Sequence, residues 1–193
     1  MLDRIKARLC EQDEITQRYI ALNGFDGILT VLGITVGAFT TRVSSPAVLI
    51  SAGMGTAVGL FVSGFSGAYI TEKAQRLKDF KDLKDKMLDD MENSRHKEDV
   101  EAGSIVSAIF NSLSPFVFAF LCIIPYILAR AGIITMLNTA YWLSLLISAS
   151  TLALLGGYLG SIARESVAGY ALKMVGVGAI TAALTYALGL GGL

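Results

Sequence analysis

The sequence predicts an all-α polytopic membrane protein with five transmembrane helices, a short cytoplasmic helical loop, an inside N-terminus and an outside C-terminus. The 193 residues are 53% hydrophobic and 17% charged, whereas a soluble domain carries about 25% charged residues. The mean hydropathy is +0.59, and most charges fall in residues 1–20 and 72–101. This segregation excludes a single water-soluble core, and we expect one membrane domain over residues 1–193.

Five segments are apolar over the roughly 20 residues that a helix needs to cross the hydrocarbon core. They are residues 22–41, 47–71, 103–129, 138–163 and 168–190. Residues 1–20 are charged and lack the apolar region of a cleavable signal peptide. Leu2, Ile5 and Leu9 recur there at helical spacing, which predicts a cytoplasmic amphipathic helix that runs into the first span.

The orientation follows from the lysines and arginines beside the spans. Fourteen of the 16 basic residues fall on the side of the N-terminus, the 72–102 loop and the connection between the last two spans. The other side has Arg42 and Arg130. Because basic residues concentrate in cytoplasmic loops, the N-terminus and the 72–102 loop are predicted to be cytoplasmic.

The 72–102 loop has the pattern of a helix that continues from the second span. An apolar face repeats every three or four residues at Leu77, Phe80, Leu83, Met87 and Met91. A second face is acidic and consists of Asp82, Asp85, Asp89 and Glu92. These four residues are candidate ligands that collect divalent cations. The alternative is a solvated face, because Lys78, Lys81 and Lys86 lie four residues from Asp82 or Asp85.

Asp26 is the carboxylate that lies clearly inside an apolar span. A charge there costs at least ~2.5 kcal/mol on insertion scales, so Asp26 is a candidate metal ligand and proton acceptor. Alternatively, it forms a structural pair with Arg18 or Lys173. Glu72, at the cytoplasmic exit of the second span, is a second candidate ligand, or else a charge at the end of a helix.

Other intramembrane residues indicate how the helices pack. The third span carries Asn111, Ser112 and Ser114, and its prolines, Pro115 and Pro125, each free a backbone carbonyl. Three GxxxG pairs allow close approach of helices. They are Gly33/Gly37, Gly55/Gly59 and Gly156/Gly160.

Several classes of function lack support in the sequence. The formal net charge is zero, so no nucleic-acid partner is expected. Cys10 and Cys122 cannot build a disulfide framework, and no CxxC motif is present. No nucleophile and base stand in a recognisable arrangement, so we expect neither an enzyme nor a permanently bound cofactor.

Three segments of the sequence form a recognisable set. The first span opens with Arg18-Tyr-Ile-Ala-Leu-Asn-Gly-Phe-Asp26-Gly27-Ile-Leu-Thr30-Val-Leu-Gly33, the second span contains Ser63-Gly-Phe-Ser-Gly67-Ala-Tyr69-Ile-Thr71-Glu72, and the last span is Ala171–Gly189. Together these segments resemble the vacuolar iron transporter family of Fe²⁺/Mn²⁺ transporters, in particular its short prokaryotic members. In other family members a metal-binding methionine and glutamate stand where this chain has Gly64 and Ala68.

The resemblance implies export of Fe²⁺ or Mn²⁺ from the cytosol by proton antiport, with the metal ion as the transported cargo and not as a permanently bound cofactor. It also implies a homodimer whose ion pathway runs along the dimer interface, lined by the first two spans of each subunit. We expect a multi-pass protein of the cell membrane, or of a vacuolar-type membrane in a eukaryote. The alternatives are a transporter of another substrate, because two ligands are missing, and a non-transporting membrane scaffold or regulator.

Overall fold

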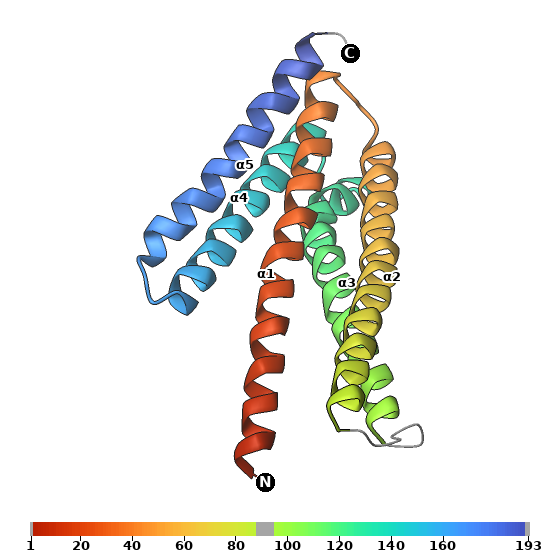
Figure 1. The fold of residues 1–193 in the computed structure, drawn as a ribbon. Helices are drawn as coiled ribbons and strands as arrows, with labels where there is room; N and C mark the ends of the chain where they lie inside the picture. The colour runs from red at the N-terminus through yellow and green to blue at the C-terminus, as the bar shows by residue number, and fades with distance from the viewer. Residues whose placement is uncertain (1, 88–94, 192–193) are drawn as a thin grey trace.

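The computed structural model describes residues 2–87 and 95–191, and it places side chains for most of residues 21–78 and 105–191. The described residues form five α-helices and no strand, which confirms the predicted all-α class. The helices, shown in Figure 1, are α1 (Leu2–Thr40), α2 (Pro46–Met87), α3 (Arg95–Arg130), α4 (Leu137–Ile162) and α5 (Val167–Leu190).

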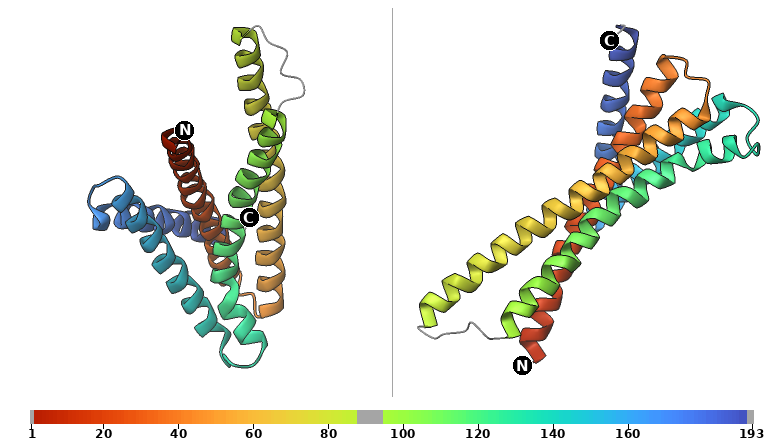
Figure 2. Two further views of the ribbon diagram at one scale, coloured as in Figure 1. Left: turned by 90° about the horizontal axis from the view of Figure 1, so that it is seen from below. Right: turned by 90° about the vertical axis from the view of Figure 1, so that its right-hand side faces the viewer.

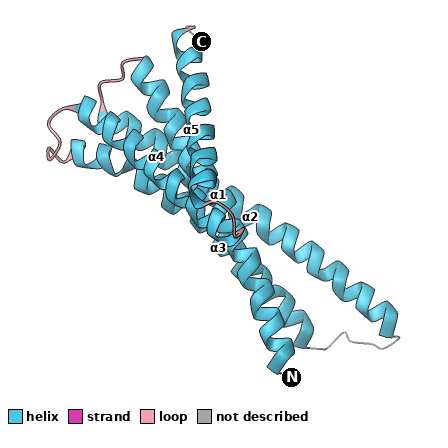
Figure 3. Cartoon of the chain, turned by 90° about the vertical axis from the view of Figure 1, so that its left-hand side faces the viewer, coloured by secondary structure: helices cyan, strands magenta, loops and turns pink. Residues whose placement is uncertain are grey.

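All five helices contain a stretch long and apolar enough to cross a membrane, as the sequence predicts. These stretches are Ala21–Thr40, Pro46–Gln75, Asn111–Arg130, Leu137–Ile162 and Val167–Leu190. Helices α1, α2 and α3 also continue beyond their apolar stretches. Their extensions project past α4 and α5 at the end of the molecule where the N-terminus lies (Figures 1 and 3). Which end faces the cytoplasm stays a prediction.

Helix α3 occupies the middle of the arrangement. It packs against α1, α2 and α4, whereas α1 and α2 have little contact with each other. Helix α5 packs on α4 and α1 and lies at the edge of the molecule (Figure 2). The first two spans are therefore held side by side mainly through α3.

The core lies where α1, α3 and α4 meet. Its buried apolar residues include Ile28 on α1, Cys122 and Ile123 on α3, and Leu152 on α4. Cys122 is fully buried and fills apolar space in this core. A second cluster, Leu49, Tyr126, Ala140 and Tyr141, lies nearer the start of α4.

Buried hydroxyl groups join the same three helices. The Tyr126 hydroxyl donates to Thr35 Oγ1 at 3.1 Å, and Thr35 Oγ1 lies 3.4 Å from Ser144 Oγ. Ser144 donates in turn to the backbone carbonyl of Cys122 at 2.8 Å. These polar groups have partners inside the protein, as groups shielded from water require. They position α1 relative to α3 and α4.

The outside of the bundle is apolar. Leu154 on α4 and Leu172 on α5 are each 74% exposed, and large apolar side chains are exposed on all five helices. Contiguous exposed apolar surface on this scale is unfavourable in water and suits the hydrocarbon of a bilayer. The structure therefore supports an integral, multi-pass membrane protein.

The three GxxxG pairs differ in what they contact. Gly33 and Gly37 face Thr185 of α5, at 3.8 and 3.6 Å from the position of an added Cβ. Gly156 and Gly160 lie against the first turn of α5, where an added Cβ would meet backbone atoms. Gly55 and Gly59 have nothing within 4 Å. Two pairs therefore serve packing within one chain, and the α2 pair is open.

Candidate functional site

The candidate site is built on the close approach of α1 to α3. A Cβ on Gly24 would lie 2.5 Å from Cδ2 of Phe118, and one on Gly27 would collide with the backbone carbonyl of Pro115. These two glycines bring the backbone of α1 against α3 at the start of its apolar stretch. Because they are three residues apart, they lie on one face of the helix, which faces α3.

Asp26 lies on the other side of α1. It is two residues after Gly24, which places it roughly opposite on a helix with 3.6 residues per turn. The residue is exposed in the protomer although it belongs to the apolar stretch Ala21–Thr40. Its backbone carbonyl accepts a hydrogen bond of 2.6 Å from Thr30 Oγ1. The carboxylate is thus presented on the surface that faces away from α3.

The structure does not pair Asp26 with Lys173, one of the two structural alternatives. Lys173 is exposed on α5, and its Nζ lies 4.7 Å from the ring centroid of Tyr170 on the same helix. Among the side chains that the structure describes, none forms a salt bridge or hydrogen bond with the Asp26 carboxylate. The Arg18 side chain lies outside the described part.

A hydrogen-bonded bridge joins three helices one turn from Asp26. Asn23 Nδ2 on α1 donates to Asn111 Oδ1 on α3 at 2.7 Å. The amide of Asn111 then donates to the Gly64 carbonyl on α2 at 2.8 Å. Asn111 is also the residue whose carbonyl Pro115 deprives of a helical partner, since proline has no N–H. The Asn23–Asn111–Gly64 bridge fixes α1 and α2 relative to each other through α3.

Gly64 is where α2 approaches α3 closely. A Cβ at this position would lie 3.3 Å from Asn111 Nδ2 and 3.3 Å from Ser112 Cα. The position where the resembling family carries methionine is therefore occupied here by a residue whose small size accommodates the bridge. Ala68, one turn further along α2, is half-buried. Neither position offers a side-chain ligand.

The other predicted ligands are not brought together by the described residues. Glu72 is half-buried on α2. Asp82 and Asp85 fall on the last turns of α2, where the side chains are outside the description, and Asp89 and Glu92 lie outside the described residues. In the part of the chain that the structure describes, no three His, Cys, Asp or Glu side chains form a group able to hold a metal ion.

Sequence reasoning found the polarity of Asn111 but missed its partners. An asparagine in an apolar span, four residues before a proline, indicates a polar contact with a neighbouring helix. The pattern does not say which helix. One partner is the side-chain amide of Asn23, in the opening motif. The other is the backbone carbonyl of Gly64, which Asn111 can reach because glycine has no side chain in the way.

We expect Asn111→Ala to destabilise the helix bundle by about 1–3 kcal/mol, because it removes both hydrogen bonds of the bridge, the one from Asn23 and the one to the Gly64 carbonyl. Ser112→Ala is the matched control, since the Ser112 hydroxyl donates a hydrogen bond of 3.1 Å to the Ile109 carbonyl of its own helix and so does not join two helices. Thermal unfolding of the purified variants measures the difference. Equal midpoints for the two variants would show that the bridge does not hold the helices together.

Comparison with known proteins gives two matches. The sequence model of the VIT family matches residues 77–190, which is more than half of the chain. An uncharacterized protein of Methanocaldococcus jannaschii is 28% identical over 171 residues, covering 86% of this chain and 84% of that protein. Together with the five apolar helices, the family match decides the assignment. The chain belongs to the VIT family, which includes the vacuolar iron transporters.

Proposed function

We propose that this chain transports Fe²⁺ or Mn²⁺ out of the cytosol in exchange for protons, as a homodimer in the cell membrane. Family membership supports a membrane transporter of metal ions. The observation that carries the finer proposal is the position of Asp26, a carboxylate on the surface of the protomer within a membrane-spanning helix.

A carboxylate in this position needs a polar environment. Facing hydrocarbon, it would cost at least ~2.5 kcal/mol on insertion scales, and intramembrane charges normally face a bundle interior or a water-filled path. No described side chain of the same protomer neutralises it. A second copy of the chain, placed against the exposed faces of α1 and α2, would remove Asp26 from lipid and enclose a path.

A second copy would also complete the ligand set. Fe²⁺ and Mn²⁺ take several oxygen or nitrogen ligands, and one aspartate does not make a site. Two copies of Asp26 facing each other double the carboxylates at one level of the membrane. We propose Glu72 as a further carboxylate near the cytoplasmic exit, and the acidic face of Asp82, Asp85, Asp89 and Glu92 as a collector of cations from the cytosol.

Proton coupling follows from the chemistry of the same carboxylates. A proton and a metal ion compete for the negative charge of Asp26, so protonation from the outer side releases the metal, and deprotonation towards the cytosol prepares the site for the next ion. No other titratable group is needed at that level of the membrane.

Flux measured in proteoliposomes tests the proposal. Purified protein is reconstituted with an imposed pH gradient, and uptake of Fe²⁺, Mn²⁺, Co²⁺ and Zn²⁺ is compared with that of empty vesicles. We expect Fe²⁺ or Mn²⁺ to move and an opposing proton flux to accompany it. Movement of a different ion would indicate a changed substrate, which the close packing at Gly64 favours because it leaves no thioether ligand. Absence of flux for every ion would favour a scaffold.

The orientation of the chain is tested by labelling its two cysteines. With the N-terminus in the cytoplasm, Cys10 is expected to react with an impermeant thiol reagent in inverted vesicles and not in intact cells. Cys122 is fully buried and should react in neither preparation. Cys122 therefore serves as the internal control, and labelling of Cys10 on intact cells would reverse the orientation.

A further inference from the structure

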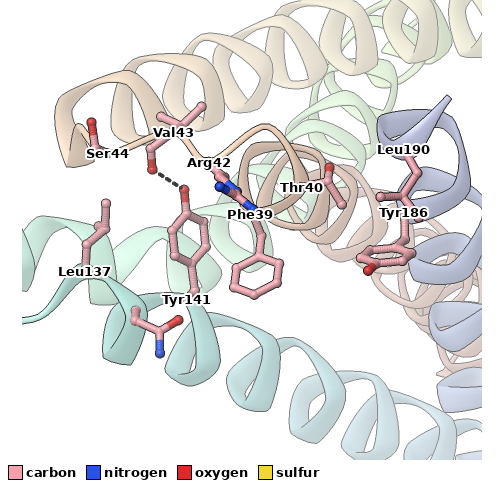
Figure 4. A pocket seen from close by; sticks show the side chains of 10 residues that line it. Phe39, Thr40, Arg42, Val43, Ser44, Leu137, Tyr141, Tyr186 and Leu190 are labelled. Carbon is pink, nitrogen blue, oxygen red and sulfur yellow. Dashed lines mark hydrogen bonds between the residues drawn. The ribbon is translucent and has the colours of Figure 1, made fainter. Parts of the chain in front are cut away.

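A pocket of about 540 Å³ lies between the C-terminal ends of α1 and α5 and the start of α4, far from Asp26. Its volume falls in the range of about 300–1,000 Å³ that is usual for small-molecule sites. We name it the Arg42 pocket. It is lined by Phe39, Thr40, Arg42, Val43, Ser44, Leu137, Asn138, Tyr141, Tyr186 and Leu190, most of which Figure 4 shows.

The Arg42 pocket is lined by both apolar and polar side chains. Phe39, Val43, Leu137 and Leu190 supply apolar surface, and the Tyr141 hydroxyl is already used, since it donates to the Val43 carbonyl at 2.9 Å (Figure 4). The side chains of Arg42, Ser44, Asn138 and Tyr186 make no hydrogen bond or ion pair with the residues that the structure describes. Their donors are available to a ligand.

Arg42 brings a positive charge that the chain does not neutralise. It is the charged residue among the ten that line the pocket. The sequence has no Asp or Glu in residues 27–71, 102–164 or 166–193, which include every lining residue. A divalent cation is therefore repelled from this pocket, and an anion is attracted.

The backbone also holds Arg42 in an unusual conformation. Its φ is +54°, and it ends α1 with hydrogen bonds from Arg42 N to the Phe39 carbonyl and from Val43 N to the Ala38 carbonyl. The end of α3 has the same arrangement with Gly132, the residue that this conformation favours. Glycine adopts this conformation more easily than arginine, so the backbone is expected to tolerate replacement of Arg42 by glycine.

The pocket lies at the ends of three apolar stretches, the level at which lipid phosphates are expected. Thr40 and Leu190 are the last residues of two apolar stretches, and Leu137 is the first of another. This is the boundary between hydrocarbon and headgroups, where tyrosines such as Tyr186 collect. An arginine fork matches the oxygens of a phosphate group, and the apolar lining residues match the glycerol and the start of the acyl chains.

We propose that the Arg42 pocket binds an anionic phospholipid, with the lipid phosphate held by the guanidinium of Arg42. With the predicted orientation, the lipid belongs to the outer leaflet. The site is independent of the transported ion, because it contains no carboxylate and lies at the opposite end of the apolar stretch of α1 from Asp26.

Arg164 provides a matched control. It ends α4 with φ +54° and the same pair of hydrogen bonds, from Arg164 N to the Ser161 carbonyl and from Glu165 N to the Gly160 carbonyl. It does not line the Arg42 pocket. Arg42→Gly and Arg164→Gly therefore remove the same charge from the same backbone conformation, and glycine relaxes both, so neither variant is expected to misfold.

The test is titration of the purified protein in detergent with phosphatidylglycerol, with bound lipid counted by native mass spectrometry. We expect Arg42→Gly to weaken binding about tenfold, the loss of one charge-assisted hydrogen-bonded contact. Arg164→Gly should bind as the wild type does, and Arg42→Lys should retain part of the affinity.

Three outcomes would overturn the proposal. Wild-type affinity in Arg42→Gly would show that Arg42 does not hold the lipid. Equal weakening by Arg42→Gly and Arg164→Gly would show a general effect of charge at the membrane surface. Displacement of the lipid by inorganic phosphate at equal concentration would identify a site for the free anion, to whose binding the apolar lining residues do not contribute.

Discussion

Replacing Asp26 with asparagine is expected to abolish metal transport and leave the fold intact. Asparagine keeps the shape of the side chain and removes the negative charge, the anionic ligand and the exchangeable proton. Because Asp26 is exposed in the protomer and no described side chain pairs with it, its neutralisation breaks no internal contact. Removing the carboxylate from a bound metal ion resembles removing one partner of a buried ion pair, which costs about 3–5 kcal/mol. Transport should therefore fall on the order of 100-fold or more.

The pH dependence should disappear together with the flux, since one group is proposed to hold the ion and the proton in turn. Asp26→Glu is the conservative control and should keep partial activity with a changed apparent affinity. Glu72→Gln tests the second carboxylate, and we expect a smaller effect because Glu72 lies at the end of the apolar stretch of α2. Flux and proton movement in proteoliposomes measure all three variants.

Two results would contradict the role given to Asp26. If Asp26→Asn protein is folded and moves Fe²⁺ or Mn²⁺ at nearly the wild-type rate, the ion does not use this carboxylate. If the variant is unfolded, Asp26 has a structural partner, for which Arg18 is the remaining candidate. Thermal unfolding of the variant separates the second result from a true loss of transport.

The sequence predicts the class of the fold well because apolar length is a local property. Each span needs about 20 apolar residues in a row, and no tertiary information is required to find them. The direction in which a residue faces is different. The sequence places Asp26 in the first span, but only the packing of Gly24 and Gly27 on α3 shows that the carboxylate lies on the exposed side.

The glycine pairs show the same limit. Gly33/Gly37 and Gly55/Gly59 have the same spacing, and the sequence offers no means to tell which pair contacts α5 and which is open. The spacing of Gly33 and Gly37 also fits a contact between two copies of the chain. They instead face Thr185 of the same chain, because α5 returns alongside α1 from the distant end of the sequence.

The candidate site was predicted in part for a related reason. A carboxylate in an apolar span has a high cost wherever it points, so Asp26 stands out without a structure. The Asn23–Asn111–Gly64 bridge does not stand out, because its residues are 88 and 47 positions apart and one acceptor is a backbone carbonyl. Backbone acceptors have no signature in the sequence.

Substituting leucine at Gly55 or Gly59 is expected to dissociate the dimer and stop transport. In the protomer an added Cβ at either position meets nothing within 4 Å, so a larger side chain leaves the contacts within the chain unchanged. Small residues four apart let two membrane helices approach closely, and leucine would hold them apart. An overpacked contact costs about 1–3 kcal/mol, and each 1.4 kcal/mol changes the dimer dissociation constant about tenfold.

Gly176→Leu is the matched control for this prediction. Gly176 is also a helical glycine with nothing within 4 Å of an added Cβ, but it lies on α5, away from the faces of α1 and α2 proposed to meet the second copy. We expect this variant to remain dimeric and active. Cross-linking in membranes and sedimentation in detergent measure the oligomeric state, and flux is measured on the same preparations.

The combination of results locates the interface. Dimers lost in Gly55→Leu or Gly59→Leu and kept in Gly176→Leu place the second copy on α2, as the proposed pathway requires. Dimers lost only in Gly176→Leu would place it on α5 instead. In that arrangement the two Asp26 carboxylates would not meet, and a pathway between two copies of α1 and α2 would have to be abandoned.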